Sequence, residues 1–312
     1  MKLGIIGLGY WGKHYIRIIN NSERASLTAI CDMNVDALSK YDYLNVSKFT
    51  DYTEMFKSGE IDGVIIVTIA KTHDTIIKNA IKYNLKIFVE KPYVLTQTLC
   101  NEINNLLKPD NKLMVGHTYL FNPKINYIKN FLENDMKNIK SINFEWTCYG
   151  PIREDTTPIF DLAVHPFSIL LLLFPNKKIT NLSCIRTSSK HTYFVIFKMD
   201  EIIISLNISW ASPGKRRQMM INNDDCKIIF DDITNVEPIK ILYKDEPNYK
   251  RQIINAIHTD GHIIIPQVPN SEPLTEQFNH WLDYIENKRE CISDEHFSKK
   301  IIELCENIEN II

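Results

Sequence analysis

The sequence predicts an α/β protein with two domains, residues 1–120 and 121–312. Two observations predict the first domain. Strand-like and helix-like segments alternate over its whole length, and a glycine-rich loop, GLGYWG at residues 7–12, links the first strand to the first helix. A third observation marks the second domain: after about residue 120 the pattern changes to runs rich in Ile, Phe, Tyr, Val and Thr.

Buried strands in the first domain are predicted by short apolar runs, and helices by the amphipathic stretches between them. Strict alternation of the two indicates right-handed strand–helix–strand units and a parallel sheet. The predicted strands are 2–6, 27–31, 63–68, 86–90 and 113–116, and the predicted helices are 12–20, 34–40, 51–57, 73–83 and 96–107.

The glycine loop has the spacing of a dinucleotide-binding turn. Gly7 permits a tight turn, Gly9 lets the backbone approach a pyrophosphate, and Gly12 allows close packing of helix on strand. The next strand ends in Asp32, 25 residues after Gly7, where an acid that binds the ribose is expected. A glycine turn without a ligand would leave Asp32 unexplained. A signal peptide is disfavoured because no small-residue cleavage site follows the apolar run.

The segment IFVEKP at 87–92 brings Glu90 and Lys91 to the carboxyl end of a predicted strand, with Pro92 fixing the turn. Open α/β sheets bind ligands at that edge. An isolated EKP would be interpreted as a surface lysine, but the glycine loop in the same domain favours a lysine aimed at a substrate oxygen beside a bound dinucleotide.

The second domain is predicted to combine a sheet with helices on one face. Alternating polar and apolar residues, as in SINFEWT, are typical of a sheet with one covered face. Strands are predicted at 139–148, 179–186, 191–199, 202–210, 217–221 and 226–230, and helices at 122–133, 161–173, 274–287 and 294–309. Ser293 is the expected N-cap of the last helix, with acids in its first turn.

Asp161 and His165 lie four residues apart at the start of the helix 161–173, and therefore on one helical face. Histidine suits proton transfer at neutral pH, and a carboxylate one turn away can orient it. By itself the pair could equally be an acid favoured by the helix dipole and an incidental histidine. Lys91 and the glycine loop shift the balance toward catalysis.

Composition excludes several classes of protein. With 36 basic and 38 acidic side chains there is no electrostatic footprint for nucleic acid or an anionic membrane, and no apolar run is long enough to span a bilayer. The seven cysteines are irregularly spaced without a CxxC, which indicates reduced thiols in a cytoplasmic protein. His258 and His262 in HTDGH are interpreted as loop residues, so no metal is expected.

Other conspicuous residues have simpler interpretations. The run Lys215-Arg216-Arg217 is expected in a solvated turn, with a phosphate contact as the alternative. Aromatic residues in the predicted strands are expected to serve sheet packing or an interface; these are Phe144, Trp146 and Trp210. His73 follows a strand and either approaches the nicotinamide ribose or caps the next helix.

The chain resembles the glucose–fructose oxidoreductase / inositol dehydrogenase (Gfo/Idh/MocA) family nearly from end to end. The segments that carry the resemblance are GIIGLGYWGKHYIRII, IVTIAKTHDTIIKNAIKYNLKIFVEKP, VGHTYLFNP, FDLAVHPFSIL and PLTEQFNHWLDYIENK. The resemblance implies a Rossmann dinucleotide-binding domain followed by an α+β domain with an open, mostly antiparallel sheet. It also implies that this sheet makes a homodimer or homotetramer.

The resemblance further implies an enzyme that transfers a hydride between NAD and a secondary hydroxyl or ketone of a sugar. It assigns Lys91, Asp161 and His165 to catalysis. The cofactor would contact Gly7, Gly9, Tyr10, Trp11, Gly12, Asp32, Thr68, His73, Glu90 and Lys91. The substrate would contact Lys91, His117, Tyr119, Arg153, Asp161 and His165. Pro166 and Ser168 stand where members often have an Asp, so one substrate contact is expected to differ.

The cofactor is expected to be NAD, with NADP less favoured, because Asp32 would repel a 2′-phosphate and its neighbours Met33 and Asn34 carry no cation. The segment GPIREDTTPIFDLAVH resembles members that act on nucleotide sugars, while free sugars and inositols stay open. Two alternatives remain: a ketosugar reductase of deoxysugar biosynthesis, and a non-catalytic NAD-binding regulator on the same fold. The presence of Lys91 with His165 argues against the regulator.

Overall fold

The structure is a computed structural model that describes residues 1–135, 138–234, 236–244 and 260–311. Contacts along the chain divide it into two units. The first contains residues 1–121, 154–156 and 271–307, and the second contains 122–153, 157–270 and 308–312. The sequence places 271–307 in the second domain, whereas their contacts place them in the first unit. Gln277 bonds Tyr15 of α1 (Tyr10–Asn20) and Ser298 bonds His117 after β6 (Leu113–Gly116), so both C-terminal helices are bonded to the first unit.

The first unit is built on a parallel sheet with the strand order β3-β2-β1-β4-β5-β6. This order is that of two mononucleotide-binding halves. Its strands are β1 Lys2–Ile6, β2 Ser26–Cys31, β3 Ser47–Phe49, β4 Gly63–Ile66, β5 Lys86–Glu90 and β6 Leu113–Gly116. The sequence analysis missed β3, which has three half-buried residues and so no apolar run.

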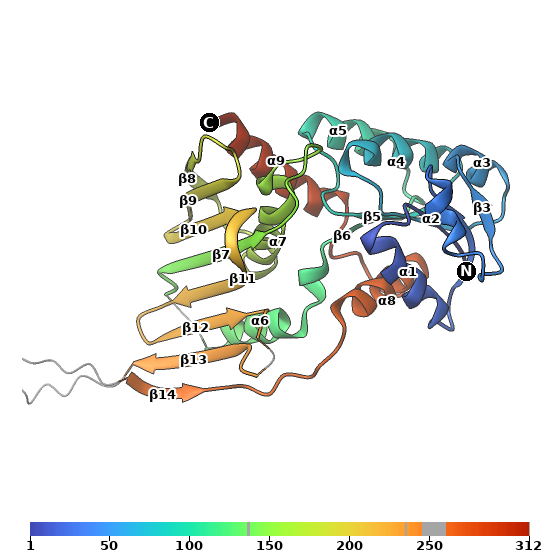
Figure 1. The fold of residues 1–312 in the computed structure, drawn as a ribbon. Coiled ribbons are helices and arrows are strands. Elements are labelled where there is room, and N and C mark those ends of the chain that lie inside the picture. The colour runs from blue at the N-terminus through green and yellow to red at the C-terminus, as the bar shows by residue number, and fades with distance from the viewer. Residues whose placement is uncertain (136–137, 235, 245–259, 312) are drawn as a thin grey trace, which may run out of the picture. The chain divides into compact units, whose positions relative to one another are not determined.

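Helices cover both faces of this sheet, and they account for its almost wholly buried strands. α3, α4 and α5 lie on one face, and α1 and α8 lie on the other (Figure 1). The helices of the unit are α1 Tyr10–Asn20, α2 Val35–Ser39, α3 Tyr52–Lys57, α4 His73–Lys82, α5 Gln97–Leu106, α8 Pro273–Ile285 and α9 Glu295–Ile311, whose last residues belong to the second unit. Asp294, not Ser293, caps α9: its Oδ1 accepts the Phe297 N–H, while Ser293 bonds β6.

The second unit contains a sheet with the order β14-β13-β12-β11-β7-β10-β9-β8. All neighbouring pairs are antiparallel except β7 and β10, which are parallel. The strands are β7 Ser141–Tyr149, β8 Ile179–Arg186, β9 Thr192–Met199, β10 Ile202–Ser209, β11 Ala211–Asn222, β12 Cys226–Asp231, β13 Ile239–Lys244 and β14 Asp260–Ile264. The predicted open, mostly antiparallel sheet is confirmed, with β13 and β14 added.

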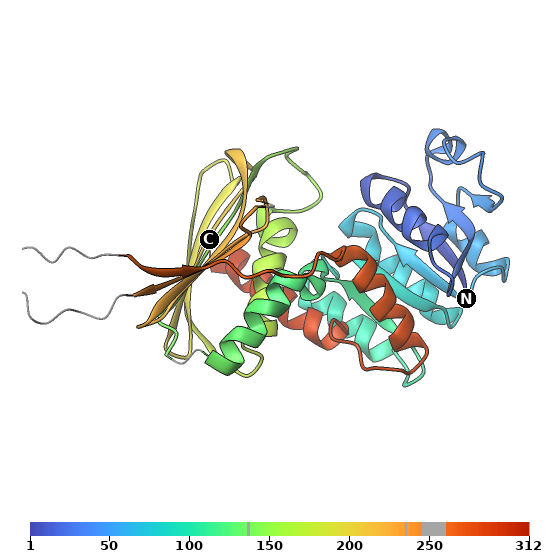
Figure 2. The same ribbon diagram turned by 90° about the horizontal axis from the view of Figure 1, so that it is seen from below.

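One face of this sheet is covered by α6 Pro123–Asp135 and α7 Val164–Leu173, and within the described residues no helix covers the other (Figure 2). The covered face carries the core, including Trp146, Tyr193 and Phe197. On the open face, side chains of β8, β9 and β10 are exposed. A π-helical turn, Ile159–Ala163, leads into α7, so the helix predicted at 161–173 begins with an irregular turn. Such turns are frequent at functional sites.

Candidate functional site

The glycine loop between β1 and α1 can be formed only with glycine at two of its positions. Gly7 has φ +97°, and a Cβ added there would lie 2.7 Å from the carbonyl oxygen of Val67. A Cβ on Gly12 would lie 2.3 Å from the carbonyl oxygen of Gly7. A Cβ on Gly9, in contrast, would meet no protein atom within 4 Å. The first two glycines therefore shape the turn, and the third leaves open space above it.

That open space lies at the N-terminus of α1. Gly9 is the N-cap, and no acidic residue lies in the first turn. The first backbone N–H groups of a helix have no intrahelical acceptor and favour an anion. Tyr10 and Trp11 stand at this end with 68% and 40% of their surface exposed. The loop, the space and the helix end fit the pyrophosphate of a dinucleotide.

Asp32 follows β2 and is bonded to the glycine loop itself. Its Oδ2 accepts the N–H of Leu8 at 2.8 Å, and its Oδ1 accepts the N–H of Asn34 at 2.9 Å. These two bonds hold the carboxylate in one orientation while each oxygen keeps acceptor capacity for a ribose hydroxyl. The carboxylate thus fits the role expected from the sequence.

A cleft of about 540 Å³ connects the glycine loop, Asp32 and the loop after β4. Its lining includes Gly7, Gly9 and Asp32 from the predicted cofactor set, together with Thr68. Thr68 is fixed by a 2.7 Å hydrogen bond to Thr72. Lys71 also lines the cleft. This cation was missed by the sequence analysis, which considered only the residues beside Asp32.

Lys91 follows β5, at the same carboxyl edge of the parallel sheet as the cleft. Its neighbour Glu90 is 5% exposed, and its carboxylate accepts from the Tyr15 hydroxyl and from the Lys91 N–H, the latter at 3.1 Å. The Glu90 side chain is thus bonded inside the unit, and its cofactor contact stays a prediction. Burial raises the pKa of Glu90, and the Tyr15 bond and the Lys91 charge oppose that shift.

His73 is enclosed rather than open to the cofactor cleft. It is 1% exposed, with Nδ1 2.9 Å from the carbonyl oxygen of Pro92 and Nε2 3.2 Å from that of Thr68. The ring thus links the loop after β4 to the turn that carries Lys91. The ribose contact of His73 stays a prediction.

The segment after β6 contains two predicted substrate residues. His117 is 1% exposed, and its Nε2 lies 3.2 Å from the Ser298 hydroxyl of α9. Burial, with a smaller effect from the charge of Lys91, lowers the pKa of His117 to about 3. His117 is therefore buried and neutral, and its substrate contact stays a prediction. Tyr119 is half-buried in the short helical turn Thr118–Phe121.

In the second unit, Asp161 lies in the π-helical turn with both carboxylate oxygens engaged. Trp210 Nε1 donates to Oδ2 at 3.0 Å, and Arg153 Nη1 donates to Oδ1 at 3.3 Å. Trp210 is 4% exposed, whereas the Arg153 side chain is 33% exposed. The structure thus brings together two predicted site residues and adds Trp210. The prediction that Trp210 serves only packing or an interface is incomplete.

His165 lies in the first turn of α7 and is half-buried. Its carbonyl oxygen accepts the Ser168 hydroxyl at 2.8 Å. Ser168 is itself fully buried, so it cannot replace the substrate contact of an acid at that position.

The basic run at 215–217 belongs to β11 and not to a solvated turn. The register of β11 against β7 breaks between Ala211 and Arg216, which forms a bulge. Arg217 is 9% exposed, donates to the Thr147 carbonyl at 2.9 Å and lies over the Trp146 ring. Packing of Trp146 is thereby confirmed.

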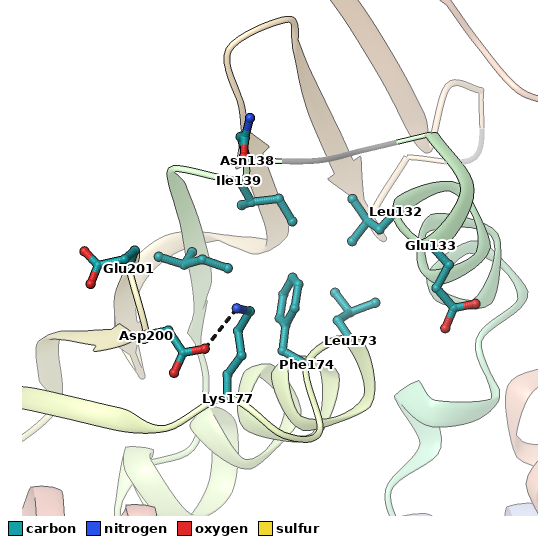
Figure 3. Close-up of a pocket in the computed structure, with 10 residues that line it drawn as sticks. Leu132, Glu133, Asn138, Ile139, Leu173, Phe174, Lys177, Asp200 and Glu201 are labelled. Carbon is teal, nitrogen blue, oxygen red and sulfur yellow. Dashed lines mark hydrogen bonds and ion pairs between the residues drawn. The ribbon is translucent and has the colours of Figure 1, made fainter.

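A second hollow, of about 400 Å³, lies in the second unit where α6 and α7 approach the turn between β9 and β10 (Figure 3). Leu132, Leu173 and Phe174 form its apolar floor. Lys177 bonds Asp200 across one side at 3.1 Å. None of the predicted site residues lines it.

Other features of the described part of the chain are negative findings. There, no group of three or more His, Cys, Asp and Glu side chains could hold a metal ion. Of the HTDGH pair, His258 lies outside the described residues, and His262 stacks on Tyr243 with ring centres 4.4 Å apart. No helix in the described ranges is long and apolar enough to cross a membrane.

Residues 1–117 match the family model described as the oxidoreductase family with an NAD-binding Rossmann fold (GFO_IDH_MocA). An uncharacterized oxidoreductase of Streptococcus pneumoniae serotype 4 is 28% identical over 134 residues, which cover 42% of this chain and 36% of that protein. An inositol 2-dehydrogenase of Salmonella paratyphi B is 28% identical over 120 residues, covering 37% and 35%. The chain thus aligns with about a third of each relative. The match of residues 1–117 shows that the N-terminal part of the chain is similar to the Gfo/Idh/MocA oxidoreductases.

Solved structures extend the similarity of fold to the whole chain. A UDP-N-acetylglucosamine 3-dehydrogenase from Acidithiobacillus ferrooxidans superposes with a TM-score of 0.85 at 17% identity, covering 100% of this chain and 97% of that one. A 3-ketoreductase from Actinomadura kijaniata, in complex with TDP-benzene and NADP, gives 0.84 at 11% identity, covering 99% and 97%. At these identities the comparison shows the fold alone.

Proposed function

We propose that this protein is an NAD-dependent oxidoreductase that interconverts a secondary hydroxyl and a ketone on a sugar. The observation that carries the proposal is the carboxyl edge of the first sheet. There the glycine loop, Asp32 and the open cleft fit a dinucleotide, and Lys91 follows β5 at the same edge. When bound, the nicotinamide would accept or supply the hydride.

The chain's own groups would position the substrate and move its proton. Lys91 would hydrogen-bond the reacting oxygen and stabilise the negative charge that develops there. His165 would take the hydroxyl proton during oxidation and return it during reduction. Asp161, held in place by Trp210 and Arg153, would keep His165 oriented. Assigning the groups of both units to one reaction follows from the motif resemblance and from their chemistry.

A nucleotide sugar is the favoured substrate, with free sugars and inositols as the other candidates. Arg153 is one-third exposed beside Asp161, where a guanidinium can contact an anionic or hydroxyl-rich ligand. The solved neighbours include a UDP-N-acetylglucosamine 3-dehydrogenase, and the curated relatives include inositol 2-dehydrogenases. Both directions of reaction use the same groups, so a ketosugar reductase stays the alternative.

NAD is favoured over NADP because Asp32 is fixed at the ribose end of the cleft. Lys71 also lines the cleft, and its positive charge would weaken the preference for NAD. The preference remains, because the Asp32 carboxylate is held at the glycine loop by the Leu8 N–H. A homodimer or homotetramer through the open sheet is proposed because four large apolar side chains are exposed on one face of β8–β10: Ile185, Phe194, Ile196 and Ile203.

The experiment is a turnover screen of UDP- and TDP-sugars, free sugars and inositols with NAD, comparing the parent with Lys91→Ala and His165→Asn. Lys91→Ala should reduce turnover by ~10²–10³ with nearly unchanged NAD affinity. His165→Asn should slow the reaction by ~10²–10⁴ and remove the rise of rate with pH in the oxidative direction. Near-parent turnover of Lys91→Ala on a verified substrate would contradict the catalytic assignment.

A further inference from the structure

Glu90 occupies an unusual position for a carboxylate. It ends β5, directly before Lys91, yet it is 5% exposed and lies among the buried residues of the first unit. A Cβ added to Gly116 on the neighbouring strand β6 would lie 3.1 Å from Glu90 Oε1. The strand beside it is therefore shaped to leave room for this carboxylate. Burying an ionised group is costly unless the surroundings bond it.

Two hydrogen bonds hold this carboxylate, and a third extends them into a chain of buried groups. The Tyr15 hydroxyl donates to Oε1, and the Lys91 N–H donates to Oε2 at 3.1 Å. Gln277 Nε2 on α8 donates to the Tyr15 hydroxyl at 3.1 Å. Tyr15 and Gln277 are both fully buried. The tyrosine ring packs on Phe88, with centroids 5.3 Å apart, which fixes the direction of its hydroxyl.

The chain of bonds connects two elements of the proposed cofactor site. Tyr15 belongs to α1, the helix that starts at the glycine loop. Glu90 belongs to the strand that carries Lys91. We propose that Glu90, held by Tyr15, is a positioning residue for Lys91: its carboxylate fixes the Lys91 backbone and supplies a negative charge beside the lysine. This inference rests on the proposed role of Lys91.

The charge on Glu90 is the property that separates this proposal from a purely structural role. Glu90→Gln keeps the shape and removes the charge: its amide oxygen can accept the Lys91 N–H, while its NH2 group can donate to the Tyr15 hydroxyl. A buried charge is seldom a net source of stability, so the variant should melt at or above the temperature of the parent. Activity should nevertheless fall by about tenfold or more, because Lys91 loses the neighbouring anion. If the role of Glu90 were purely structural, Glu90→Gln would instead lower stability and activity together.

The Tyr15 hydroxyl should act through the protonation of Glu90. Burial raises the pKa of Glu90, and the bond from Tyr15 opposes that rise. Around Glu90 the described titratable groups are Tyr15 on α1, Lys91 on its own strand and His117 after β6, and His117 stays neutral because its pKa is about 3. Tyr15→Phe should therefore move the acidic limb of kcat/KM about one to two pH units upward. Near-parent rates should return at high pH.

A readout that needs no substrate separates this proposal from the proposed function. Pulse acetylation of the folded protein with an amine-reactive ester, followed by mass spectrometry, measures how readily the Lys91 side chain reacts, with exposed Lys82 as internal reference. Glu90→Gln should raise Lys91 acetylation about tenfold, because the buried carboxylate that positions the lysine is gone. Tyr93→Phe is the matched control. Tyr93 lies two residues after Lys91, and the hydroxyl of this buried residue bonds Asn104. Removing that hydroxyl should change neither the acetylation of Lys91 nor the turnover rate.

Equal Lys91 acetylation in the parent and Glu90→Gln would overturn the positioning role, whatever the substrate screen finds. Increased acetylation without turnover of any sugar would support the positioning role and refute the proposed function. If the acidic limb of kcat/KM lies at the same pH in Tyr15→Phe as in the parent, the proposed link from Tyr15 on α1 to Glu90 is also overturned. NAD affinity within about twofold of the parent in both variants would confirm that the effects act on Lys91 and not on the cofactor site.

Discussion

Gly9 and Gly12 allow a direct test of the cofactor loop, because the structure assigns them opposite reasons for being glycine. Gly9→Ala adds a methyl group that meets no protein atom within 4 Å, at a backbone conformation of φ −71° and ψ −153° that alanine can adopt. Its free energy of unfolding should change by less than about 0.5 kcal/mol. Its Kd for NAD should nevertheless rise at least about tenfold, because the methyl group fills the space proposed for the pyrophosphate.

Gly12→Ala should behave in the reverse order, with instability as the primary effect. The new Cβ would lie 2.3 Å from the Gly7 carbonyl oxygen, so the loop and helix must separate by roughly 1 Å. Overpacking of backbone on backbone should cost about 2–4 kcal/mol, which lowers Tm by about 5–15 °C. NAD binding should weaken as a consequence of the displaced loop.

The assay is thermal unfolding followed by circular dichroism with and without NAD, combined with calorimetric NAD titration. Gly59→Ala is the control, because Gly59 has φ +69° and no atom within 4 Å of its added Cβ. It should lose about 1–2 kcal/mol from backbone strain and bind NAD like the parent. Parent-like NAD affinity in Gly9→Ala would refute the pyrophosphate position, and parent-like Tm in Gly12→Ala would refute the packing argument.

The remaining predictions concern the cofactor, pH, the proposed acid and assembly. The parent should bind NAD more tightly than NADP by fluorescence titration, and Asp32→Ser should narrow the gap; tighter NADP binding by the parent would contradict the role of Asp32. Because the pKa of His117 is lowered from 6.5 to about 3, the folded chain cannot take up the proton that the unfolded chain binds, so stability should fall with pH below 6.5, by about 2 kcal/mol at pH 5. Urea unfolding at several pH values should show that the free energy of unfolding falls less steeply toward low pH in His117→Asn than in the control His296→Asn, whose side chain is 74% exposed. Equal slopes of unfolding free energy against pH in the two variants would count against the burial effect. Trp210→Phe removes one donor to Asp161 and should lower kcat about tenfold at little change in KM; an unchanged kcat would show that this bond is not needed. Light scattering should find a dimer or tetramer for the parent and smaller species for Phe194→Asp, and a monomeric parent at micromolar concentration would defeat the proposed interface.

Most of the fold could be predicted because its signals are local in the sequence. The glycine loop, the apolar strand runs and the change of pattern near residue 120 each depend on neighbouring residues. β3 was missed because its three half-buried residues form no apolar run. β13 and β14 were also missed, although both contain apolar residues. The sequence did not predict that residues 271–307 contact the first unit, because their partners, such as Tyr15 and His117, lie far away in the sequence.

The candidate site was predictable in its motifs and not in the directions of its side chains. Glu90 and His73 were expected at the cofactor because they adjoin the edge of the sheet, yet both side chains are buried and bonded inside the unit. Alternation along a strand predicts which face a residue occupies, but at the last residue of a strand a turn can send the side chain either way. A buried tyrosine in a helix beside a glycine loop gave no signal that it would meet a carboxylate 75 residues away.

The two carboxylates of the proposed site share one physical design within their separate units. Glu90 and Asp161 each have both oxygens engaged, and in each case one donor is an aromatic side chain that is almost fully buried, Tyr15 or Trp210. An aromatic donor has few rotatable bonds, so it fixes the carboxylate at a low entropic cost. Groups fixed before the substrate arrives need no reorganisation when charge develops. Replacing either aromatic donor with phenylalanine should therefore impair kcat more than KM, whereas replacing Arg153, which both bonds Asp161 and is proposed to contact the substrate, should affect kcat and KM together.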